Sequence, residues 1–234
     1  VAMVSGKKIG LRERSTMQDA ISAPKVGGIV RFTGFILKGT FIVELTGAVL
    51  MAPQFIKDFG FVKGIWYAVF HSISAFCNAG FDLMGPISGE FTSLESFVGD
   101  PFVNGVVIML ILLGGLGFFV WEDLFKNRLH WKKLRLHTRV ALTLAAVLVV
   151  VPSLFFFFTE KNASMAGLPL GTRIWASAFS AVTPRTAGFD TVPTGELSPA
   201  GGLMTLILMM TGGNSGSTAG GAKTTTILLV LLTA

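Results

Sequence analysis

A four-residue stretch, Ala-Gly-Phe-Asp, occurs as residues 79–82 and again, 108 positions later, as residues 187–190. Each copy follows a short segment of aromatic and small residues, 64–76 and 172–183. Glycine tolerates positive φ, which lets successive carbonyl oxygens turn toward one axis. Rings of such oxygens replace the hydration shell of a monovalent cation. The repeat therefore predicts a cation filter built from backbone.

The predicted ion-facing backbone comprises two matched sets of four residues. They are Asn78, Ala79, Gly80 and Phe81, and Thr186, Ala187, Gly188 and Phe189. The two phenylalanine side chains are expected to pack behind the loops. Asp82 and Asp190 are expected at the outer mouth, where negative charge concentrates cations.

The composition indicates an integral membrane protein. Hydrophobic residues make up 51% of the 234 residues and charged residues 14%, against roughly 25% charged in soluble domains. A single cysteine, Cys77, excludes an intrachain disulfide framework and offers no metal-ligand set, and we expect it to be a buried small side chain.

The elements that position the repeat are predicted to be helices, so the fold class is an all-α polytopic membrane protein. Residues 35–56, 102–121 and 140–158 are apolar and long enough to span a bilayer. Residues 64–76 and 172–183 are too short. We expect Thr183 to leave the α region because Pro184 follows it. A glycine-rich tract interrupts the apolar residues 201–234.

Basic residues indicate the orientation. Twelve of the 19 lysines and arginines lie in segments 5–34 and 122–139, which the positive-inside rule places in the cytoplasm. The net charge of +6 therefore belongs to one membrane face, and we expect no nucleic acid. The two short segments become half-helices that enter from outside. Their carboxyl ends, with partial negative charge, point to the middle of the membrane.

The glycine-rich tract is predicted to be a gate below the filter. Its residues are Thr211, Gly212, Gly213, Asn214, Ser215, Gly216, Ser217, Thr218, Ala219, Gly220, Gly221 and Lys223. A phosphate-binding loop would make the chain an NTPase, but Ala222 places Lys223 one residue too late for G-x-x-x-x-G-K-[ST]. Irregular polar backbone at membrane depth must line a cavity or be buried in protein. A purely structural helix break is the alternative.

These features resemble the Trk/Ktr/HKT superfamily of potassium transport proteins. Residues 70–81 and 181–189 are similar to the second and third filter segments of its bacterial KtrB-type subunits, and residues 211–224 to their intramembrane loop. The resemblance implies four repeats around a pseudo-fourfold pore, passive K⁺ conduction, and Na⁺ as a candidate activator. It also implies a homodimer with a cytosolic nucleotide-binding ring of the KtrA type. No covalent chemistry or bound cofactor is expected; a cation-coupled secondary transporter is the rival.

On this interpretation the chain is an internal fragment of a longer protein. Residues 1–34 end a first repeat and form a basic linker, 35–125 form the second repeat, 126–139 a cytoplasmic loop, and 140–234 the third repeat. Four further side chains have either a functional or a structural role. Glu44 lies within a predicted span, where an ionisable group is a functional candidate, although we favour a carboxylate bonded to neighbouring structure. Arg185 is expected to pair with an acidic residue, and His71 to pack with one hydrogen bond. Lys223 carries its charge into the cavity or pairs with a carboxylate.

Overall fold

The computed structural model describes residues 10, 15–16, 18, 28–90, 92–128 and 130–233. They belong to two compact units, residues 1–42 and 43–234, each considered by itself. Most of the predicted basic segment 5–34 lies outside the described residues. In the first unit, helix α2 (Ile29–Phe59) begins, and it continues into the second unit.

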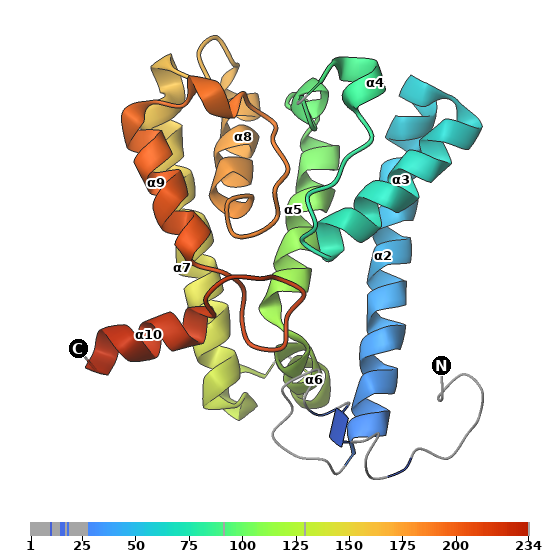
Figure 1. Cartoon of the computed structure of the whole chain (residues 1–234), viewed down its shortest axis with the longest axis vertical. Helices are drawn as coiled ribbons and strands as arrows, with labels where there is room; N and C mark the ends of the chain where they lie inside the picture. Colours follow the sequence, from blue (N-terminus) through green and yellow to red (C-terminus); the bar gives the residue numbers. More distant parts are fainter. Residues whose placement is uncertain are drawn as a thin grey trace. The chain divides into compact units, whose positions relative to one another are not determined.

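Helices joined by turns and loops make up the second unit (Figure 1). The described residues contain one isolated β-bridge, between Thr211 and Ala222. The elements after α2 are α3 (Phe61–Phe76), α4 (Gly85–Ser88), η1 (Glu95–Phe97), α5 (Pro101–Leu116), α6 (Phe118–Asn127), η2 (Trp131–Lys133), α7 (Leu136–Thr159), η3 (Glu160–Asn162), α8 (Leu170–Val182), η4 (Thr194–Glu196), α9 (Pro199–Met210) and α10 (Thr224–Thr233). The predicted all-α class is confirmed.

The long apolar helices differ from the predicted spans in one important way. Two helices, α2 and α7 with η3, are long and apolar enough to cross a membrane. The predicted span 102–121 is not one helix, because α5 and α6 meet at a 95° bend. Gly117 lies at the bend with φ 88°, a conformation that glycine adopts without steric cost. α2 is also longer than predicted and contains Pro53.

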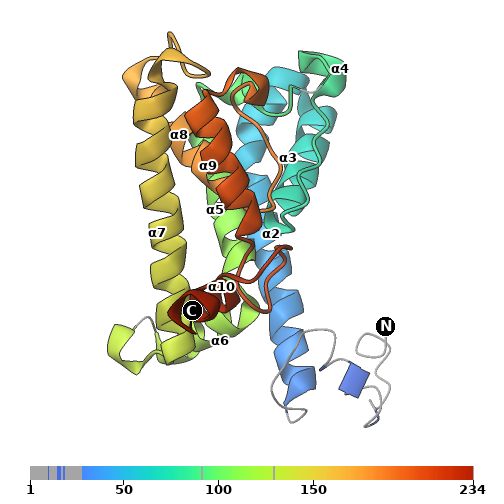
Figure 2. The same ribbon diagram turned by 60° about the vertical axis from the view of Figure 1, so that its left-hand side comes forward.

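The two short helices end within one residue of their predicted ends but begin two to three residues earlier than predicted, at Phe61 and Leu170. α3 and α8 end partway along the neighbouring long helices, and irregular loops follow them (Figures 1 and 2). α3 packs on α5, while α8 packs on both α7 and α5. One expectation was wrong: Thr183, which precedes Pro184, keeps right-handed helical angles of φ −60° and ψ −39°. The preference against this conformation before proline is overridden here.

Matching caps start the helices that follow the outer loops. Asp100 accepts hydrogen bonds from the amides of Phe102 and Val103, and Pro101 occupies the first turn of α5. Ser198 caps α9 in the same way, with Pro199 next. Proline is tolerated there because the first amides of a helix have no partner within it.

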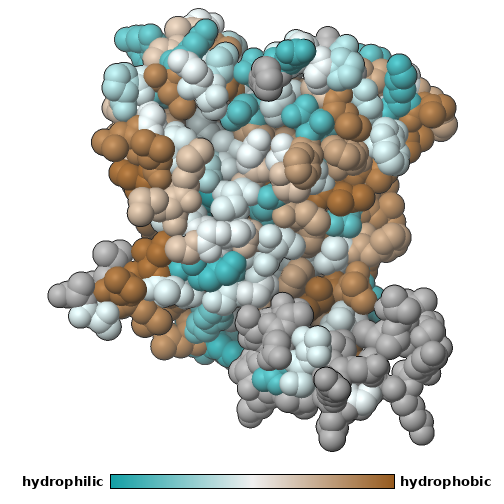
Figure 3. Space-filling model, in the orientation of Figure 1, coloured by the Kyte–Doolittle hydropathy of each residue, from teal (hydrophilic) through white to brown (hydrophobic). Residues whose placement is uncertain are grey.

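Apolar side chains remain exposed along the sides of the unit. Examples are Val150 and Leu154 on α7, and Leu203 and Leu206 on α9. Figure 3 shows these brown flanks, with paler and more polar atoms in the central strip between α9 and α3. Exposed apolar surface of this extent is typical of helices that face lipid.

Candidate ion pathway

The loops after α3 and α8 have the same backbone conformation at matched positions. Asn78 and Thr186 have φ of 51° and 69°, and Gly80 and Gly188 have φ of 70° and 82°. Positive φ is uncommon for a non-glycine residue and points to a local constraint. The repeat recognised in the sequence is therefore a repeat of backbone geometry.

These two loops lie against each other. A Cβ atom added at Gly80 would lie 2.5 Å from the carbonyl oxygen of Ala187, and one added at Gly188 would lie 3.3 Å from Cα of Gly80. Glycine is favoured at both positions by the positive φ, and at Gly80 the close approach of the Ala187 carbonyl also excludes a side chain. Segments 108 residues apart form one local structure, as the filter prediction requires.

Hydroxyl groups on the short helices engage the last carbonyl of each loop. Ser74 Oγ donates a hydrogen bond of 2.7 Å to the Phe81 carbonyl. Thr183 Oγ1 donates to the Phe189 carbonyl. Each of these two carbonyl oxygens thus bonds to a hydroxyl at the end of the short helix that precedes its own loop.

The phenylalanine side chains differ between the copies. Phe189 is fully buried and its ring centroid lies 6.4 Å from that of His71, so it packs behind the loop as predicted. Phe81 is 70% exposed, so that prediction was wrong for the first copy. Among the described residues, none covers the exposed part of the Phe81 ring.

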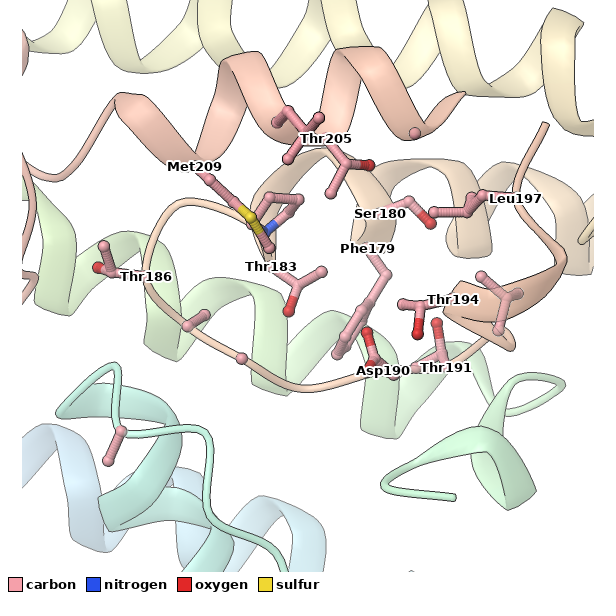
Figure 4. A pocket seen from close by; sticks show the side chains of 17 residues that line it. Phe179, Ser180, Thr183, Thr186, Asp190, Thr191, Thr194, Leu197, Thr205 and Met209 are labelled. Atoms are coloured by element: carbon pink, nitrogen blue, oxygen red, sulfur yellow. The ribbon is translucent and has the colours of Figure 1, made fainter. Parts of the chain in front are cut away.

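A cavity of about 630 Å³ lies between α8, α9 and the second filter loop. Figure 4 shows Thr183, Thr186 and Asp190 around it, with Thr205 and Met209 contributed by α9. Ala79 of the first loop also lines it. Both loops therefore border the same cavity, whose lining combines threonine hydroxyls and Asp190 with apolar side chains of α8 and α9.

Acidic residues gather at the outer end of the loops. Asp82 accepts a hydrogen bond of 2.9 Å from the Met84 amide. Asp190 is fixed by its backbone, whose carbonyl accepts from the Leu94 amide at 2.8 Å. Burial, followed by the negative charges of Glu95 and Asp82, raises the pKa of Asp190 to about 6. Asp82, Asp190 and Glu95 thus lie near enough to interact, and only the first two were predicted.

The glycine-rich tract docks directly below the filter. Thr218 Oγ1 donates to the Phe76 carbonyl at 2.8 Å and accepts from Asn78 Nδ2 at 3.0 Å. At its ends, the Gly212 amide donates to the Ala222 carbonyl at 2.9 Å. The tract is therefore a closed loop in which Thr218 bonds both to the end of α3 and to the loop that follows it.

The same tract fills the bend between α5 and α6. The amides of Thr218 and Asn214 donate to the carbonyls of Gly114 and Gly115, at 3.2 and 2.9 Å. Asn214 Nδ2 donates to the Leu116 carbonyl at 3.2 Å. Helix ends leave such carbonyls without partners, so the loop completes the broken helix. The sequence reasoning missed this docking site, although the run of three glycines at 114, 115 and 117 was a signal for the break.

Arg185 and Lys223 have different partners from those expected. Arg185 is 8% exposed, its Nε has no hydrogen-bond partner, and no acidic residue of the described chain pairs with it. The predicted ion pair was wrong. Lys223 Nζ donates to the Ala219 carbonyl at 2.8 Å, so it stabilises the glycine-rich tract itself and does not pair with a carboxylate.

Glu44, His71 and Cys77 connect helices around the first filter loop. His71 is fully buried and has two partners where one was expected: the Tyr67 carbonyl lies 2.7 Å from Nδ1, and the Leu83 amide donates to Nε2 at 3.4 Å. Cys77 is exposed, contrary to expectation. Its Sγ lies 3.8 Å from Glu44 Oε1, a contact that agrees with the structural interpretation of Glu44.

The described residues contain no group of three or more His, Cys, Asp or Glu side chains that could hold a metal ion. The long apolar helices, two half-length helices and broken helices define a multi-pass α-helical membrane protein. The chain belongs to the TrkH family of cation transport proteins, whose family profile matches residues 2–233. The resemblance inferred from the filter segments is thereby confirmed, and this is not a family of enzymes.

Characterised relatives support the same assignment. The chain is 38% identical over 209 residues to Ktr system potassium uptake protein B of Bacillus subtilis, covering 88% of this chain and 45% of that protein. It is 40% identical over 208 residues to potassium/sodium uptake protein NtpJ of Enterococcus hirae, covering 87% of this chain and 44% of that protein. The chain thus spans less than half the length of these relatives.

A solved structure shares the fold. The potassium transporter TrkH from Vibrio parahaemolyticus superposes with a TM-score of 0.68 at 20% sequence identity, over 94% of this chain and 44% of that chain.

Proposed function

We propose that this chain contributes two of four repeats to a pore for potassium uptake across the cytoplasmic membrane. The observation that carries the proposal is the pair of matched loops, each with positive φ at two positions, in contact at the ends of two half-length helices. Backbone of this kind at membrane depth must line a pathway or be buried in protein. The carbonyl-rich loops supply the ligands that a dehydrated K⁺ ion needs.

Residues from outside this chain are expected to complete the filter on its open side, where the cavity beside Thr186 and Asp190 lies. On this proposal the carbonyls of Asn78, Ala79 and Gly80, with their counterparts, coordinate the ion. Asp82 and Asp190 attract cations at the outer mouth. Conduction is passive and follows the electrochemical gradient. Segments 5–34 and 122–139 face the cytoplasm, and Na⁺ is a second candidate ion because one relative is named a potassium/sodium uptake protein.

The glycine-rich tract acts as the gate. It hydrogen-bonds both to the filter loop and to the broken helix, so it occupies the pathway's inner side in this conformation. Opening requires these bonds to break together. A cytosolic nucleotide-binding ring acting on a homodimer would shift the equilibrium between the closed and the open gate. This partner is suggested by one relative, which is named a Ktr system protein.

Cation flux into liposomes tests the filter and the gate separately. The complete parent protein should be compared with Gly188→Ser and with Gly171→Ser, a control on α8 with open space around it. We expect Gly188→Ser to lose selectivity for K⁺ over Na⁺, or conductance, while the control retains both. Deleting residues 212–221 should raise flux without changing selectivity. Unaltered selective flux in Gly188→Ser would instead favour a coupled transporter with a different ion site.

A further inference from the structure

The helix after the bend is suited to the membrane surface. α6 leaves α5 at 95°, so it runs roughly parallel to the bilayer where α5 crosses it. It buries Val120 and Trp121 against the protein and leaves Phe125 72% exposed. The polar residues of α6 include Glu122 and Lys126, and Arg128 caps its carboxyl end. A helix with an apolar face and adjoining basic residues is typical of an interfacial position.

The segment after α6 folds back onto it through a buried carboxylate. Asp123, 1% exposed, accepts hydrogen bonds from Asn127 Nδ2 at 2.8 Å and from the Arg135 amide at 2.9 Å. Arg139 Nη2 donates to the Lys132 carbonyl at 2.6 Å. These bonds hold α6, η2 and the first turn of α7 together as one structured surface.

This surface, here called the basic platform, consists of Lys126, Arg128, Lys132 and Lys133 with Trp131 and Leu136. The ion pairs found among the described residues involve Arg135, which lies 3.9 Å from Glu122 and 3.7 Å from Asp123. The four cations of the platform are exposed and pair with no carboxylate of the described chain. Its positive charge is therefore available to a partner.

Apolar side chains lie among these charges. Trp131 is 52% exposed and Leu136 is 77% exposed. Leu136 begins α7, and Trp131 begins η2 five residues earlier. Val147 and Val150 remain exposed further along α7. Tryptophan is enriched at the membrane–water boundary, and basic clusters beside a spanning helix attract anionic headgroups. A soluble acidic protein would match the charges but would leave Leu136 without an apolar environment.

We propose that the basic platform binds anionic phospholipids of the adjoining leaflet. The four cations hold the headgroup phosphates, and Trp131 and Leu136 extend into the upper acyl region. The bound lipid would fix α6 at the surface, next to the bend that the glycine-rich tract completes.

Lipid selectivity measured by fluorescence quenching tests this proposal. The complete protein is reconstituted with mixtures of phosphatidylcholine and phosphatidylglycerol, one of them carrying bromine on its acyl chains. The contribution of Trp131 is the difference between the parent and Trp131→Phe, since Trp66, Trp121 and Trp175 supply the background. We expect brominated phosphatidylglycerol to quench Trp131 preferentially.

The charge requirement is tested with Lys126→Gln/Lys132→Gln/Lys133→Gln. The matched control is Lys57→Gln/Lys63→Gln/Lys161→Gln, which removes equal charge from the predicted opposite side. Since each basic residue near an anionic surface strengthens binding about fivefold, we expect the first variant to lose preference by about 100-fold. The control should retain it, and inorganic phosphate should not compete. Equal quenching by both lipids would overturn the proposal, as would a preference for phosphatidylglycerol that is retained in the triple-lysine variant. A triple-lysine variant that loses only binding to a soluble protein would also overturn it.

Discussion

Thr218 Oγ1 lies 3.0 Å from Asn78 Nδ2, so a residue of the glycine-rich tract bonds to one of the positive-φ residues of the loop after α3. The same hydroxyl also donates to the Phe76 carbonyl at 2.8 Å. Residues 140 positions apart therefore link the inner loop to the filter. Any movement of the tract must break these two bonds or move the filter with it.

Removing this link should favour the open pathway. Thr218→Val retains the shape of the side chain but loses both bonds, each worth about 0.5–1.5 kcal/mol net. We expect flux through the parent protein to rise by about 5- to 100-fold, with K⁺ over Na⁺ preference reduced if Asn78 also shifts. Single-channel or liposome flux measurements check this. Thr226→Val, at an exposed position of α10, is the control; equal flux in both variants would argue against a link.

The contact between the two loops should be intolerant of a methyl group. Gly80→Ala places a Cβ 2.5 Å from the Ala187 carbonyl oxygen and forces an alanine to positive φ, at about 1–2 kcal/mol for the backbone alone. We expect flux to fall by at least about tenfold while the protein remains folded. Gly85→Ala, with open space around it, should conduct normally. A conducting Gly80→Ala protein would show that the loops are apart in the functional assembly.

Asp190 should make conduction depend on pH near 6. Its pKa is raised to about 6, so lowering the pH from 8 to 5 protonates the carboxylate and removes its attraction for cations. We expect K⁺ uptake to fall over this range. Asp190→Asn should have low uptake at high pH and a flatter profile. A parent profile that is flat between pH 5 and 8 would exclude Asp190 from the outer mouth.

The same titration has a stability consequence of defined sign. Because the folded pKa of Asp190 lies above its ordinary value of 3.8, the folded protein favours the neutral acid. Its contribution to stability is complete below pH 3.8 and is lost as the pH rises through about 6. Asp190→Asn should therefore unfold at a higher temperature than the parent at pH 8. At pH 4 the difference should be smaller.

The buried Glu160 should be essential to the outer end of the third repeat. Its Oε1 accepts from Ser198 Oγ at 2.5 Å, and a Cβ at Gly201 would lie 2.1 Å from the same oxygen. We expect Gly201→Ala to lower the free energy of unfolding by about 1–3 kcal/mol. Gly202→Ala, next in α9 with open space, should be neutral or stabilising by up to about 1 kcal/mol. Thermal unfolding in detergent compares them, and similar melting temperatures would contradict this role.

Much of the architecture could be predicted from local patterns. The long apolar runs, the half-length segments and the repeated Ala-Gly-Phe-Asp are properties of consecutive residues, because span length and glycine placement act locally. They predicted the all-α class and the two short helices, whose predicted ends at 76 and 183 lie within one residue of the observed ends at Phe76 and Val182. The family resemblance depended on the same stretches.

Only the tertiary structure decided which distant residues meet. The bend at Gly117 depends on the glycine-rich tract, whose amides donate to carbonyls about a hundred residues earlier. The hydropathy of the sequence does not predict hydrogen bonds between such distant residues. Arg185 lacks the expected acidic partner among the described residues, and Lys223 bonds to a carbonyl of its own loop. Burial and loop geometry select these partners, and a pattern of charges in the sequence does not predict them. The amino-acid sequence thus determined the elements and their order, whereas long-range packing determined the hydrogen bonds between inner loop and filter.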